Sequence, residues 1–169
     1  MRLTGEKGFT YIELVIALAI AVLVGGAASS ATFQVLKNSE CQGNHMTAVR
    51  QVQNAGYWIA HDTRMAQSIS TDNLTPPDFL ALSWTAGDEY QIVYTLENMP
   101  QSLLKKLHRN QSINGIPDAT TFIAQHIDPA VTDCAFAAGK LSLTVKATVG
   151  GGAARQSEAR TYKFVPRPG

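Results

Sequence analysis

The chain has 169 residues, of which 45% are hydrophobic and 16% charged, so length and composition favour one domain with a modest core. Its 14 basic and 13 acidic side chains leave a formal net charge of +1. This balance excludes a global field that would attract nucleic acid or an acidic surface. Charge is nevertheless uneven along the chain, because Glu13 is the only charged side chain between Phe9 and Phe33.

The first predicted element is an apolar helix over residues 9–36. From Leu14 to Phe33 the sequence carries no charge, and about 20 helical residues cover roughly 30 Å of hydrocarbon. Arg2 and Lys7 precede this segment. By the positive-inside bias we expect the start of the chain in the cytoplasm and the remainder outside it.

An ordinary secretory signal is the alternative for this region. A short polar leader, an apolar stretch and the small residues 27–31 also match a signal peptide with its cleavage site. That alternative predicts a secreted or signal-anchored binding domain that works alone. The carboxylate of Glu13 and the length of the apolar stretch favour a retained helix instead.

The string GEKGFTYIELVIALAI, which begins at Gly5, resembles the class III signal of type IV prepilins and type II secretion pseudopilins. The resemblance implies that residues 1–8 are a leader, that a prepilin peptidase cuts between Gly8 and Phe9, and that the new amine of Phe9 is methylated. It also implies that Glu13 acts in assembly with other pilin or pseudopilin subunits on an inner-membrane platform. The chain departs from the family pattern at Tyr11, where leucine is usual, and in having no proline in its membrane helix.

Two roles for Glu13 remain open from the sequence. A carboxylate in hydrocarbon is costly alone, so pairing with the Phe9 amine of an adjacent subunit would favour one stagger of the helices over others. Alternatively, Glu13 caps the N-terminus of its own helix, where the helix dipole favours negative charge.

Residues 37–70 are predicted to continue the helix in amphipathic form, loosened around Cys41–Asn44. Apolar or small residues recur there with a spacing of three and four, which marks one packed face: Met46, Val49, Val52, Ala55, Ile59, Ala66 and Ile69. The turn-rich segment Thr71–Asp78 contains Pro76 and Pro77 and ends the helix.

Residues 71–169 are predicted to form a β-rich head. A hairpin turns at Gly87, later strands turn at Gly139, and a last strand follows the glycines 150–152. Between Thr95 and Thr120 the pattern does not separate a strand from a helix, and Gly115 with Pro117 predicts a loop there. The predicted fold is therefore α+β, a long N-terminal helix packed on a mostly antiparallel sheet. This layout is similar to minor pseudopilins of the J class.

No catalytic motif is evident, so we expect a structural subunit and not an enzyme. The four histidines and two cysteines lack metal-ligand spacing, and we expect neither a cofactor nor nucleic acid as a partner. Cys41 and Cys134 would both lie outside the cytoplasm, where one disulfide could persist; two independent thiols are the alternative. Pilus, secretion and DNA-uptake assemblies are not distinguished by these patterns.

Overall fold

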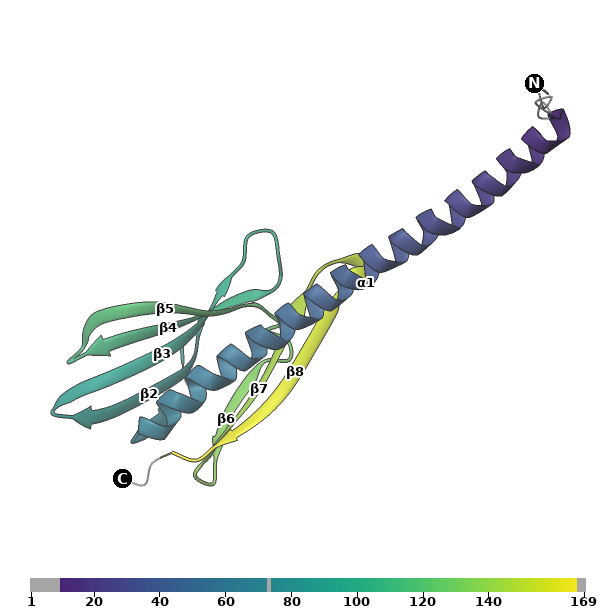
Figure 1. Ribbon diagram of the computed structural model, residues 1–169. Helices are drawn as coiled ribbons and strands as arrows, with labels where there is room; N and C mark the ends of the chain where they lie inside the picture. The colour runs from purple at the N-terminus through teal and green to yellow at the C-terminus, as the bar shows by residue number, and fades with distance from the viewer. Residues whose placement is uncertain (1–9, 73, 167–169) are drawn as a thin grey trace, which may run out of the picture. The chain divides into compact units, whose positions relative to one another are not determined.

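The computed structural model describes residues 10–72 and 74–166 and confirms an α+β fold, one long helix with an antiparallel sheet (Figure 1). The chain divides into two compact units, Met1–Glu40 and Cys41–Gly169. The elements in order are α1 (Tyr11–Met65), β1 (Ser68–Ser70), β2 (Asp78–Ala86), β3 (Asp88–Asn98), β4 (Lys105–Ile113), β5 (Ile116–Ile127), β6 (Asp133–Ala137), β7 (Lys140–Val149), the short 3₁₀ helix η1 (Gly152–Ala154) and β8 (Gln156–Phe164).

The helix α1 has no break, so the predicted loosening around Cys41–Asn44 is wrong. In the second unit the loop between β7 and β8 lies against this stretch of the helix. The Asn44 side-chain amide donates a hydrogen bond of 2.9 Å to the Ala154 carbonyl. Gly150 allows this close approach, because its φ is +82° and a Cβ there would collide with Asn44 Nδ2.

The helix also ends earlier than residue 70, the predicted end of the amphipathic segment. It stops at Met65, and Ser68–Ser70 form β1, which pairs with β2. Ile69 therefore lies on a strand. The helical spacing of apolar residues predicted too long a helix, because β1 is short and begins only three residues after the end of α1.

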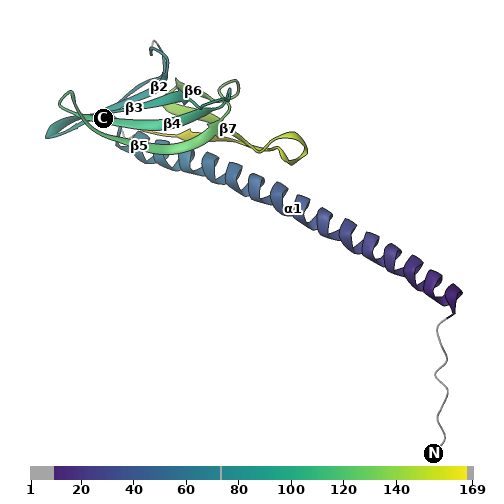
Figure 2. The ribbon, with the colours of Figure 1, turned by 90° about the horizontal axis from the view of Figure 1, so that it is seen from above.

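Every strand pairing in the sheet is antiparallel, in the order β1-β2-β3-β4-β5-β7-β6, with β8 on β7. Between β5 and β7 the register has one pair, Ile127 with Ala147. The sheet therefore consists of two well-paired halves, β1–β5 and β6–β8, joined at one point. Figure 2 shows the strands lying over one side of the C-terminal stretch of α1.

The predicted hairpins are confirmed. β2 and β3 turn at Gly87, where φ is +83°, and β6 and β7 turn at Gly139. The undecided segment between Thr95 and Thr120 contains strand β4, which turns at Asn114-Gly115 into β5. Pro117 lies inside β5 and not in a loop; a proline is tolerated on a strand whose other edge is unpaired.

The core of the second unit lies between α1 and the sheet. Val52, Ala55 and Ile59 are fully buried as the amphipathic pattern predicted, whereas Met46 is 53% exposed. These buried side chains join one cluster with residues of the sheet, among them Leu80, Leu82, Ile92, Leu107, Leu141 and Leu143. Burying each large aliphatic side chain contributes about 1.5–3 kcal/mol, so this face attaches residues 41–65 to the head.

Gly56 marks the closest approach of α1 to β8. A Cβ built at Gly56 would lie 2.5 Å from the ring of Tyr162, a separation that packed atoms do not adopt. The Tyr162 hydroxyl donates a hydrogen bond of 3.3 Å to the Val52 carbonyl, one turn earlier. A glycine is therefore required at this position so that the tyrosine ring can lie directly on the helix backbone.

Candidate membrane and assembly segment

Residues 11–40 of α1 leave their apolar side chains uncovered within the chain. All residues from Tyr11 to Glu40 are exposed, including Leu23 at 73% and Phe33 at 72%. This stretch of the helix is long enough and apolar enough to cross a membrane. Soluble proteins rarely expose so large an apolar area, so this stretch is a candidate membrane or interaction segment.

Glu13 caps the start of α1 together with Thr10. The Glu13 Oε2 atom accepts a hydrogen bond of 2.9 Å from the Thr10 backbone N–H and one of 2.8 Å from the Thr10 hydroxyl. The Thr10 hydroxyl in turn accepts a long bond of 3.4 Å from the Glu13 N–H. This reciprocal arrangement is a capping box, which the Thr-x-x-Glu spacing predicts. In the single chain, therefore, Glu13 is the cap of its own helix.

The second carboxylate oxygen of Glu13 is not used by the cap. Both hydrogen bonds from Thr10 go to Oε2, and Oε1 accepts none from the residues that the structure describes. A carboxylate can accept several hydrogen bonds. The cap and a contact with a second molecule are consequently compatible.

The polar residues in the middle of the apolar stretch are bonded within the helix. The hydroxyls of Ser29 and Ser30 donate to the carbonyls of Gly25 and Gly26, at 2.9 and 3.0 Å. Thr32 does the same to Ala28 at 3.0 Å. Each of these hydroxyls bonds to a carbonyl four residues earlier, so it does not need water as a partner. Polar groups in the hydrocarbon core of a membrane must be satisfied within the protein in this way.

The predicted processing residues Gly8 and Phe9 lie outside the described residues. The helical segment begins two residues after the predicted cut. Thr10, the partner of Glu13, would remain in the mature chain. The cleavage and methylation therefore stay predictions.

Cys41 and Cys134 are free thiols, and the structure does not bring them together. Cys41 Sγ lies 3.9 Å from the carbonyl oxygen of Ala153, in the loop beyond the end of β7. Cys134 is on β6 opposite Leu143, six residues before that end, which corresponds to about 20 Å of strand. A disulfide needs Cα atoms about 4.4–6.8 Å apart, so a bridge between these two cysteines does not fit this fold.

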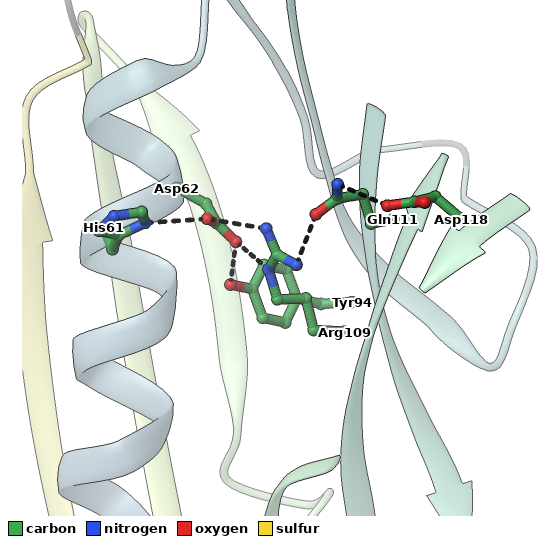
Figure 3. A network of polar contacts seen from close by, with 6 residues as sticks. All are labelled: His61, Asp62, Tyr94, Arg109, Gln111 and Asp118. Atoms are coloured by element: carbon green, nitrogen blue, oxygen red, sulfur yellow. Dashed lines mark hydrogen bonds and ion pairs between the residues drawn. The ribbon is translucent and has the colours of Figure 1, made fainter. Parts of the chain in front are cut away.

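The sequence reasoning missed a buried ion pair between α1 and the sheet (Figure 3). Asp62 is fully buried and Arg109 is 8% exposed. Arg109 Nε donates to Asp62 Oδ2 at 2.7 Å and Nη2 to Oδ1 at 3.2 Å. The Arg109 guanidinium also lies 5.5 Å from the ring centre of Trp58, at a distance that allows a cation–π contact.

Tyr94 completes this network. It lies opposite Arg109 on the neighbouring strand, and its hydroxyl donates a hydrogen bond of 2.6 Å to Asp62 Oδ2. Burial, reinforced by the charge of Asp62, raises the pKa of Tyr94 above its usual range, so the phenol stays protonated and keeps donating. Arg109 Nη1 further bonds Gln111 at 2.9 Å, and Gln111 bonds Asp118 at the surface.

This network attaches α1 to the sheet. Both Asp62 oxygens are taken up by Arg109 and Tyr94, with His61 Nδ1 3.2 Å from Oδ1. Among the described residues no group of three histidine, cysteine or carboxylate side chains could hold a metal ion. The one indication of this network in the sequence was Asp62, an aspartate within the amphipathic segment on the side of the helix that is buried.

Comparison with protein-family models, curated proteins and solved structures finds no match.

Proposed function

We propose that this chain is a structural subunit, of the minor type, of a type IV pilus or a type II secretion pseudopilus. It is processed by a prepilin peptidase and assembled through its N-terminal helix. Before assembly it is a single-pass protein of the inner membrane with its head outside the cytoplasm. Its partners are other pilin or pseudopilin subunits, the assembly platform and membrane lipid.

The observation that carries this proposal is the exposed apolar half of α1 directly after the motif at Gly8. Residues 11–40 bury nothing within the chain, while residues 41–65 are packed on the head. A helix with one exposed apolar half suits two successive environments, first lipid and then a bundle of identical or related helices. Cleavage at the motif, between Gly8 and Phe9, takes place between these two stages.

Glu13 has a defined role in this proposal. After the cut, the amine of Phe9 has a pKa near 8 and is largely cationic at neutral pH. Oε1 of Glu13 is available to the Phe9 amine of an adjacent subunit while Oε2 keeps its bonds to Thr10. The pairing penalises other staggers, because an unpaired charge in an apolar bundle is costly.

A second candidate function is a signal-anchored or secreted binding domain that works alone. It is favoured by the capping box itself, because Glu13 is already bonded to Thr10 without a second molecule. In that case the apolar half of α1 is only an anchor or a removed signal.

N-terminal sequencing of the membrane-extracted protein separates these functions. We expect a mature chain that starts at methylated Phe9. A start near Ala31, after the small residues, would contradict the subunit proposal. In a second arm, Gly8→Val places a side chain at the cut, and we expect the leader to stay attached. Loss of residues 1–8 from this variant, read by mass, would show that the cut is assigned wrongly.

A further inference from the structure

A groove crosses the head where the segment before β2 meets the ends of β3 and β6. It consists of two adjoining cavities of about 600 and 490 Å³. Both are lined by Asp78, Phe79 and Leu96, so the two cavities adjoin each other at these residues. All the residues that line the groove belong to the second unit, so it is a feature of the head alone.

The core holds the apolar side chains of the groove in fixed positions. Phe79 and Leu96 are partly buried and pack against the core cluster, so their positions are set by the fold. Leu74 adds apolar surface to one cavity, and the ring pair Pro76 and Pro77 to the other. A ligand that lies here gains contact with hydrophobic surface that need not rearrange.

The rim of the groove is acidic. Four carboxylates line it, those of Asp72, Asp78, Glu97 and Asp133, against the ammonium of Lys105. Lys105 donates a hydrogen bond to the side-chain oxygen of Asn98. Within the described residues Asp72, Asp78 and Asp133 form no ion pair. This local excess of negative charge contrasts with the near-neutral chain as a whole.

We propose that this groove binds an extended segment of another protein, in which lysine or arginine alternates with apolar residues. Alternation places cations on one side of an extended chain and apolar side chains on the other, and the groove offers acidic residues beside apolar ones. An anionic membrane surface would be repelled by the four carboxylates. Binding at this groove does not depend on assembly of the chain into a filament.

The test uses the full-length chain in neutral detergent and a fluorescent octapeptide of alternating lysine and leucine that carries one photoreactive group. Anisotropy measures its Kd, and mass spectrometry maps the cross-links. The groove variant is Asp72→Asn with Asp133→Asn, two exposed side chains whose loss leaves the core intact. The matched control is Glu89→Gln, an exposed carboxylate at the far end of β3.

We expect cross-links at residues 71–72, 74–79, 96–98 and 132–134. The groove variant should weaken binding about tenfold, since each of the two exposed pairs contributes a factor of at most about five. The Glu89→Gln control should bind as the wild type does, and a peptide with glutamate for lysine should not bind. Absence of binding, equal weakening by Glu89→Gln, or cross-links elsewhere would overturn the proposal. Because the readout is binding in detergent, failure here leaves the N-terminal sequencing result unaffected.

Discussion

Residues 11–40 and residues 41–65 belong to the same helix, yet they are stabilised in different ways. Along residues 11–40 all side chains are exposed, and apolar residues lie all round the helix. Along residues 41–65 a single face is buried against the sheet, and the pair of Asp62 with Arg109 and the close approach at Gly56 reinforce it. The difference teaches that helical periodicity records what packs inside the chain. Where nothing in the chain packs against the helix, as along residues 11–40, no single apolar face is selected.

The strongest test of the packed half is removal of Asp62. Asp62→Ala leaves the Arg109 guanidinium buried without its partner, and breaking such a pair costs about 3–5 kcal/mol. We expect the urea midpoint of the head to fall accordingly, read by tryptophan fluorescence of the full chain in detergent. Glu158→Gln is the control, because it removes only the partly exposed pair with Arg160 and should cost less than about 1 kcal/mol. Equal effects of the two variants would refute the attachment role.

The glycines of α1 give a second contrast. Gly56→Ala should destabilise the head by about 1–3 kcal/mol, because the new methyl group meets the Tyr162 ring. Gly43→Ala meets nothing within 4 Å and should stabilise the helix by up to about 1 kcal/mol. Tyr162→Ala should abolish the extra cost of Gly56→Ala in a double-mutant cycle. A cycle without coupling energy would show that the close contact is not the cause.

The exposed half is tested through Glu13 and Thr10. If Glu13 pairs with a neighbour, Glu13→Leu should leave membrane insertion normal while recovery in sheared filaments falls about tenfold or more, equivalent to about 1.4 kcal/mol. Thr10→Ala keeps the carboxylate and removes the cap, at about 1 kcal/mol, and should assemble. Equal loss in both variants, at equal membrane yield, would mean that Glu13 acts only as the cap of its own helix.

The smallest expected effect concerns Cys134. Burial, reinforced by Asp133, raises the pKa of Cys134 to about 12 from an ordinary 9.0. At pH 9 roughly one molecule in a thousand then carries the thiolate, so iodoacetamide should label Cys134 only after unfolding. The raised pKa also means that the stability linked to the protonated thiol is complete below about pH 9 and declines towards about pH 12.

Mass spectrometry of native and urea-treated protein reads this labelling, and Cys41→Ser isolates the Cys134 signal. Rapid labelling of native Cys134 at pH 9 would contradict the raised pKa of its thiol. Two cysteines that react only after reduction would instead reveal the disulfide that the fold does not accommodate.

The sequence predicted those features that depend on local chemistry. The charge-free run, the turns at Gly87 and Gly139 and the amphipathic face around Ile59 follow from spacing and backbone preference. The capping box at Thr10 and Glu13 also depends only on residues close together in the sequence. The role of Glu13 was nevertheless interpreted mainly from the free-energy cost of placing its carboxylate in hydrocarbon. Fold class therefore followed from the order of these patterns.

Features that depend on distant contacts were not predictable from local patterns. The helix is intact at Asn44, and the Asn44 side chain bonds to a carbonyl more than a hundred residues later in the chain. Likewise, Asp62 and Arg109 are 47 residues apart, and each alone is typical of a surface charge. The groove also combines segments from three regions of the chain, so its acidic rim appears only after folding.

The spacing of the attachments along α1 determines how the head carries a mechanical load. Asn44 binds the β7–β8 loop, Gly56 lies on β8, and Asp62 binds β4, over a helix length of about 27 Å. A pull along the helix axis therefore stretches these attachments together in shear, and no single one has to bear the force first. Peeling the helix away sideways would break them one after another. A head pulled or pushed through its N-terminal helix would thus be loaded in its stronger direction.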